Sequence, residues 1–146
     1  MGILMQVISS KIVQAAVLSW IAVNILKILI FSIRNKKLDF SVALKTGNMP
    51  SSHTAVIVGI ASMMYLLEGF SNLFFFSALL AGFITYDSVT LRKQVGEHYF
   101  VINEMLKNKI FSKVREKYKI KKYLGHKISE VLVGIVVGIA VAVLIA

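Results

Sequence analysis

Four long apolar runs dominate this sequence of 146 residues, and they constrain its fold more than any other feature. They cover about residues 12–33, 53–67, 73–91 and 128–146. A helix needs roughly 20 apolar residues to cross the hydrocarbon core of a bilayer, and only the run at 53–67 is clearly shorter than that. That short run indicates an untilted or only partly inserted helix. We therefore predict an all-α fold, in which residues 1–146 form one integral membrane helical bundle of about four transmembrane helices.

The composition agrees with a membrane protein and limits the kinds of site that the chain can build. Hydrophobic residues make up 57% of the sequence and charged residues only 16%, whereas soluble domains average about 25% charged residues. Cysteine is absent, which excludes disulfides and thiolate metal sites. The formal net charge of +10 suits anionic lipid headgroups. Because no nucleic-acid-binding module is recognisable, we predict a membrane partner and no nucleic acid.

The positions of the basic residues predict the topology. If each apolar run crosses once, the polar segments 34–52 and 92–127 lie on one side of the membrane. The first contains Arg34, Lys36, Lys37 and Lys45, and the second contains 11 further basic residues. The positive-inside rule places both in the cytoplasm, with 92–127 as a basic helical hairpin or loop. The predicted location is the plasma membrane of a prokaryote, and residues 1–10 either extend the first span or lie along the interface.

Ionisable residues gather at the cytoplasmic ends of the predicted spans. Burying a charge in hydrocarbon is costly, so such residues are functional candidates. Lys27 and Arg34 lie at the end of the first span, and His53 lies at the start of the second. Asp87 and Arg92 lie at the end of the third span, and His126 and Glu130 lie at the start of the fourth. The sequence thus predicts one polar site beneath the cytoplasmic headgroups. Asp87 is expected to pair with a cation from another helix, Lys27 being one candidate, or to orient a catalytic group.

Two of these groups have competing interpretations. Lys27 and Arg34 are seven residues apart and share a helix face, so they either hold an anion or extend separately to the headgroups; the spacing favours neither. Ser51, Ser52 and His53 begin a helix, and helix N-termini bind phosphate through free N–H groups. A capped helix would explain one serine but not the second serine and the histidine, so we favour an anion site.

The start of the fourth span offers a second histidine. His126 and Glu130 are four residues apart and would lie side by side on a helix. A carboxylate bonded to an imidazole fixes its tautomer and makes the other nitrogen a better base or nucleophile; the alternative is a purely structural pair. Farther along, Gly134 and Gly138 have the small-xxx-small spacing that indicates close helix packing.

Several motifs resemble one known superfamily. Three of them resemble the three-part signature of the type 2 phosphatidic acid phosphatases and related vanadium haloperoxidases: Lys27-x6-Arg34, Pro50-Ser51-Ser52-His53 and Gly125-His126-x3-Glu130. The divergent branch of that superfamily is the most similar. Its small membrane proteins have segments like Met49-Pro50-Ser51-Ser52-His53, Tyr86-Asp87 before Arg92-Lys93, and Leu124-Gly125-His126.

The resemblance implies a metal-independent phosphatase without a cofactor that acts on a lipid phosphate of the phosphatidate, phosphatidylglycerophosphate or polyprenyl type. His126 would be the nucleophile that forms a phosphohistidine, Glu130 would hold it, and His53 would protonate the leaving alkoxide. The phosphoryl oxygens would be bound by Lys27, Arg34, Ser51, Ser52 and Arg92, with Asp87 and Lys122 in supporting roles. Such a site needs no metal, because cations and a helix N-terminus supply the charge.

The chain also departs from the superfamily pattern. Four positions differ: Ser52 stands where the superfamily has glycine, Glu130 where it has aspartate, Asn35 where it has proline and Ile120 where it has arginine. Lys121, Lys122 or Arg92 would take the place of that missing arginine. Typical members have about six spans rather than four, so a homo-oligomer would be one way to complete the site. Two alternatives to an enzyme stay open: a non-catalytic protein that binds or carries phosphorylated lipids, and a small scaffold whose basic loop contacts partners.

Overall fold

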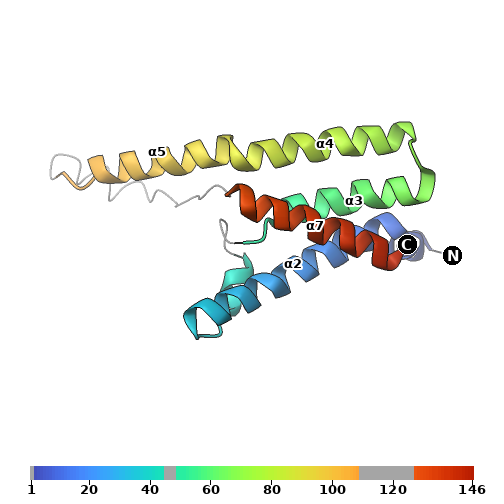
Figure 1. Cartoon of the computed structure of the whole chain (residues 1–146), viewed down its shortest axis with the longest axis horizontal. Coiled ribbons are helices and arrows are strands. Elements are labelled where there is room, and N and C mark those ends of the chain that lie inside the picture. The colour runs from blue at the N-terminus through green and yellow to red at the C-terminus, as the bar shows by residue number, and fades with distance from the viewer. Residues whose placement is uncertain (1, 45–48, 109–126) are drawn as a thin grey trace.

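The structure is a computed structural model that describes residues 2–44, 49–108 and 127–146, and every element in these ranges is helical. In chain order the helices are α1 (Ile3–Ser9), α2 (Lys11–Asn35), η1 (Phe40–Leu44, a 3-10 helix), α3 (Ser52–Glu68), α4 (Asn72–Val89), α5 (Leu91–Met105) and α7 (Ile128–Ile145). Helices α2, α3 and α7 pack together, α4 lies along α3, and α5 continues α4 beyond the bundle (Figure 1).

Within the described ranges, three stretches are long and apolar enough to cross a membrane: Lys11–Asn35, Asn72–Met105 and Ile128–Ile145. Helix α3 has 17 residues, which at 1.5 Å per residue is slightly shorter than a bilayer core of about 30 Å. Large apolar side chains such as Phe76 and Leu144 are mostly exposed on the outside, as a lipid solvent requires. The all-α integral membrane bundle predicted from the sequence is therefore confirmed.

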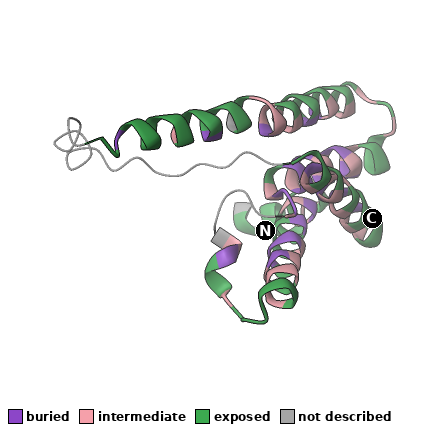
Figure 2. Ribbon diagram, turned by 60° about the vertical axis from the view of Figure 1, so that its left-hand side comes forward, coloured by how far each residue is buried: buried purple, intermediate pink, exposed green. Residues whose placement is uncertain are grey.

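Small residues form the centre of the bundle. The buried positions of α2, α3 and α7 include Ala15, Ser19, Gly59, Gly138 and Ala142. Buried ribbon segments occur on all three helices where they pack together (Figure 2). Helices in a membrane associate through such residues because the backbones can approach closely. A Cβ atom added to Gly134 would lie 2.8 Å from the Ser51 carbonyl oxygen, which confirms the close packing expected there.

The contacts between helices show which ends lie together. Lys27 bonds to Ser52 and Ser19 lies against Gly59, so α2 and α3 are antiparallel. Gly134 approaches Ser51, whereas Gly138 approaches Ala55 and Gly59, so α3 and α7 run in the same direction. After the turn at Gly69, whose φ is +66°, α4 runs back along α3 (Figure 1). One end of the bundle thus contains the end of α2, the end of α4 and the starts of α3 and α7; we call it the site end.

The structure also settles or corrects expectations about the connecting segments. Residues 1–10 do not extend the first span, because the extended backbone of Ser10 (ψ 118°) separates α1 from α2. Segment 34–52 is not simply a polar loop, since η1 packs on α2 and buries Val42 to 1% exposure. The basic segment 92–127 begins as helix α5, which a break at Thr90 (φ −108°, ψ −83°) separates from α4. Its remainder, 109–126, lies outside the described residues.

Candidate functional site

The start of α3 uses its two serines for different purposes. Ser51 is the N-cap: its hydroxyl oxygen accepts a hydrogen bond from the Thr54 N–H at 3.4 Å and another from the Thr54 hydroxyl at 3.0 Å. Both side chains are fully buried. Because the cap occupies the Ser51 hydroxyl, the neighbouring hydroxyl of Ser52 is left for another helix.

That other helix is α2, which supplies Lys27. The ammonium nitrogen Nζ donates a hydrogen bond to Ser52 Oγ at 2.6 Å, and only 5% of the Lys27 surface is exposed. A lysine that merely extended to the headgroups would keep its ammonium in water. Lys27 therefore points into the bundle, whereas Arg34, seven residues farther along α2, is exposed. At 1.5 Å per residue their Cα atoms are roughly 10 Å apart along the helix axis.

Glu130 connects the start of α7 to the same place. Its backbone carbonyl accepts a hydrogen bond from the Ser51 N–H at 3.0 Å, so the first turns of α3 and α7 are directly joined. Its carboxylate accepts a bond from the Lys127 N–H at 3.2 Å and interacts electrostatically with the Lys27 ammonium. Lys27, Ser52 and Glu130 thus come from three helices; we call them the polar cluster. The negative charge of Glu130 reduces the free-energy cost of burying the positive charge of Lys27 inside the bundle.

The other predicted site residues lie at the same end of the bundle or outside the described residues. His53 is exposed in the first turn of α3, Asp87 is half-buried near the end of α4, and Arg92 belongs to the first turn of α5. Lys122 and His126 lie outside the described residues.

The start of α7 is described from Lys127 onwards. Lys127 has an extended backbone (ψ 152°) and α7 begins at Ile128. The Lys127 N–H donates a hydrogen bond to the Glu130 carboxylate, which holds the backbone at the helix start. The predicted pairing of His126 with Glu130 falls outside the described residues and stays a prediction.

Asn24 is a polar residue of this region that the sequence interpretation did not select. Only 8% of its surface is exposed, and neither its amide nitrogen nor its amide oxygen has a hydrogen-bond partner within the described part of the chain. It precedes Lys27 by three residues and so neighbours it on α2. That spacing was the available signal, but the sequence alone does not show that α3 and α7 bury this face.

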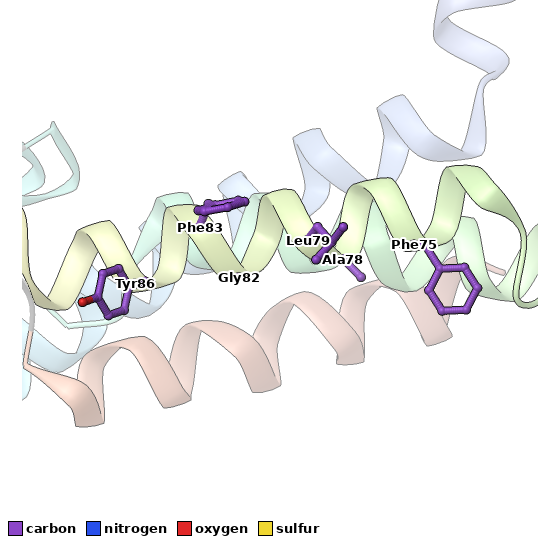
Figure 3. A pocket seen from close by; sticks show the side chains of 6 residues that line it. All are labelled: Phe75, Ala78, Leu79, Gly82, Phe83 and Tyr86. Carbon is purple, nitrogen blue, oxygen red and sulfur yellow. The ribbon is translucent and has the colours of Figure 1, made fainter.

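A groove elsewhere on the molecule has a different character. It lies on α4, has a volume of about 480 Å³, and contains no charged side chain (Figure 3). Its walls are Phe75, Ala78, Leu79, Gly82, Phe83 and Tyr86. Because these side chains are almost wholly apolar, the groove is suited to hydrocarbon and not to a phosphoryl group.

Comparisons with known proteins assign most of the chain to one group. The sequence profile described as "Divergent PAP2 family" matches residues 8–141. An uncharacterized membrane protein of Bacillus subtilis (strain 168), YuiD, is 34% identical over 135 residues, an alignment that covers 84% of this chain and 85% of that protein. No solved structure matches the chain.

Proposed function

The chain belongs to the divergent PAP2 family, and from this membership and the polar cluster we propose that it is a membrane phosphatase that hydrolyses a phosphorylated lipid. The observation that carries the proposal is the buried ammonium of Lys27, bonded to Ser52 at the N-terminus of α3. A buried cation beside a helix N-terminus attracts an anion from two directions, because the dipole and the free N–H groups add to the charge.

The geometry at the site end supports specific roles in binding phosphate. Lys27, Ser52 and the first N–H groups of α3 would contact the phosphoryl oxygens, with the exposed Arg34 compensating charge from the outer side. Arg92, in the first turn of α5, keeps its predicted role in binding phosphate in this proposal. Ser51 was expected to contact phosphate too. Since its hydroxyl is buried in the helix cap, we propose that it holds the start of α3 in place instead.

The proposed reaction has two steps. A ring nitrogen of His126 attacks phosphorus, the bond from phosphorus to the lipid oxygen breaks, and His53 donates a proton to the departing alkoxide. Water then attacks the phosphohistidine, His53 takes the proton of that water, and inorganic phosphate leaves with His126 restored. Glu130 contributes by fixing the backbone of Lys127, the residue after the nucleophile, and by balancing charge. Asp87 and Lys122 keep supporting roles in this proposal.

The proposed site faces the cytoplasm of a prokaryotic cell. Both basic segments of the chain join the helices at the site end, and the positive-inside rule places such segments in the cytoplasm. The substrate would then be a lipid of the inner leaflet of the plasma membrane, whose phosphate lies at the depth of the helix ends.

The test is a phosphate-release assay on the purified full-length protein in detergent, with EDTA present and a panel of lipid phosphates. We expect turnover in the wild type and a loss on the order of 100-fold or more in His53→Ala and in His126→Ala, given what general acids and nucleophiles contribute. His98→Ala is the matched control, because His98 is exposed on α5 away from the polar cluster.

Each outcome has a definite meaning. Turnover that survives His126→Ala would reject that residue as the nucleophile. Vanadate binding without turnover on any lipid would favour the non-catalytic lipid-phosphate binder, for which the buried Lys27 would still be useful. If vanadate does not bind, the anion site itself is rejected.

A further inference from the structure

The amide of Asn24 is a polar group that is buried and has no hydrogen-bond partner among the residues that the structure describes. It is more than nine-tenths buried, and both its donor and its acceptor are unpaired among the described residues. An unpaired buried polar group is costly, and in a bilayer no bulk water relieves that cost. A polar side chain is therefore retained here at the expense of stability, which is the pattern expected of a group that binds something.

Its depth follows from the register of the helices. Lys27 is level with Ser52, and Ser19 is level with Gly59, so positions on α2 between them face the first two turns of α3. Asn24 comes three residues before Lys27, which puts it about 4.5 Å farther from the site end on the same buried face. The amide thus lies directly on the membrane side of the cation that is proposed to bind phosphate.

We propose that Asn24 determines specificity by hydrogen bonding to a polar group of the lipid next to its phosphate, such as an ester carbonyl or hydroxyl of a glycerol backbone. This inference rests on the proposed phosphatase function. A phosphate held at Lys27 and Ser52 directs the rest of the lipid toward the membrane interior, where Asn24 lies. A glycerolipid offers oxygen atoms within a few bonds of its phosphate, whereas a polyprenyl phosphate continues directly as hydrocarbon.

The two lipid classes would then be distinguished by the state of the amide. A glycerolipid satisfies it, while a polyprenyl phosphate leaves it unpaired in the complex. A site that is built to hydrogen bond a substrate group rejects an analogue that lacks that group more strongly than an apolar pocket rejects an extra methylene. The discrimination would come from Asn24, because Lys27 and Ser52 contact only the phosphate that both classes share.

The experiment compares phosphatidate with a polyprenyl monophosphate in identical mixed micelles. For the wild type we expect kcat/KM to favour phosphatidate by about 10- to 100-fold. Asn24→Leu, of similar size, should lose that preference by lowering kcat/KM for phosphatidate while the polyprenyl value stays within about twofold. Ser19→Ala is the control: it removes another buried, unpaired group of α2 about 7.5 Å deeper and should change neither value.

The failures are separable. If Asn24→Leu lowers both kcat/KM values equally, the residue is structural, and if the wild type prefers the polyprenyl phosphate, the inference is wrong while the phosphatase stands. If the wild type hydrolyses neither lipid, the proposed function fails instead. In that case the inference is tested by binding: each lipid is titrated against bound vanadate, in the wild type and in Asn24→Leu. If both proteins prefer phosphatidate over the polyprenyl phosphate to the same extent, the inference is wrong.

Discussion

Replacing Gly138 with alanine is expected to push α7 away from α3. A Cβ atom at this position would lie 2.5 Å from the carbonyl oxygen of Ala55 and 2.8 Å from the backbone nitrogen of Gly59. Both are backbone atoms of α3 and cannot rotate aside, whereas the third neighbour, the Val58 Cβ at 3.2 Å, is only slightly too close. The added methyl group can therefore be accommodated only if the two helices separate.

The size of the effect follows from two opposing contributions. Ordinary van der Waals contact begins at 3.4 Å, so the helices would have to separate by roughly 1 Å. Overpacking of this kind costs about 1–3 kcal/mol. Alanine recovers up to about 1 kcal/mol because it favours the helix more than glycine does. We expect a net loss of about 1–2 kcal/mol in the free energy of unfolding.

Thermal unfolding in detergent micelles measures this effect, with Gly82→Ala as the matched control. Gly82 is also a mid-helix glycine, but a Cβ atom added there meets nothing within 4 Å. Gly138→Ala should unfold at a lower temperature than the wild type, and Gly82→Ala at the same temperature or a higher one. If the two variants are equally stable, α3 and α7 do not pack as closely as the structure shows.

Three further predictions concern the site end. Ser51→Ala should destabilise the protein by about 1 kcal/mol through loss of the helix cap, while Ser52→Ala should leave the unfolding temperature nearly unchanged and weaken vanadate binding in a titration. Lys27→Met should weaken vanadate binding by about 10-fold or more, whereas Lys37→Met, at an exposed position, should change it by less than about twofold. Lys36→Gly should raise the unfolding temperature without affecting phosphate release, because Lys36 ends α2 with a φ of +50° that glycine adopts freely.

Most of the fold could be predicted from the sequence because span length and loop charge are local properties. The runs at 12–33 and 128–146 become α2 and α7 with ends shifted by at most two residues. The ends of the apolar runs predicted the helix boundaries near Ser10 and Thr90, but not the non-helical backbone of these two residues. Neither position has a glycine or a proline beside it, and both residues are compatible with a continuing helix.

The candidate site was predictable only as a set of helix ends. A serine that caps a helix and a serine that binds a partner look alike in a sequence, and the packing of α2 on α3 decides that Ser51 is the first and Ser52 the second. The same packing decides that Lys27 is buried while Arg34 is not. The pairing of His126 with Glu130 stays a prediction, because His126 lies outside the described residues.

The charges at the site end bear on how a phosphate could bind. The Glu130 carboxylate offsets part of the Lys27 charge, so Lys27 alone cannot balance a phosphomonoester that carries about −1.5 to −2 charges at neutral pH. The starts of α3 and α7 contribute roughly +0.5 each, since both N-termini lie at this end. The rest has to come from Arg34 and other exposed cations. Salt screens exposed charges strongly and buried charges much less. The affinity for an anion should therefore fall as ionic strength rises, but only by the part of the binding free energy that Arg34 and its exposed neighbours contribute.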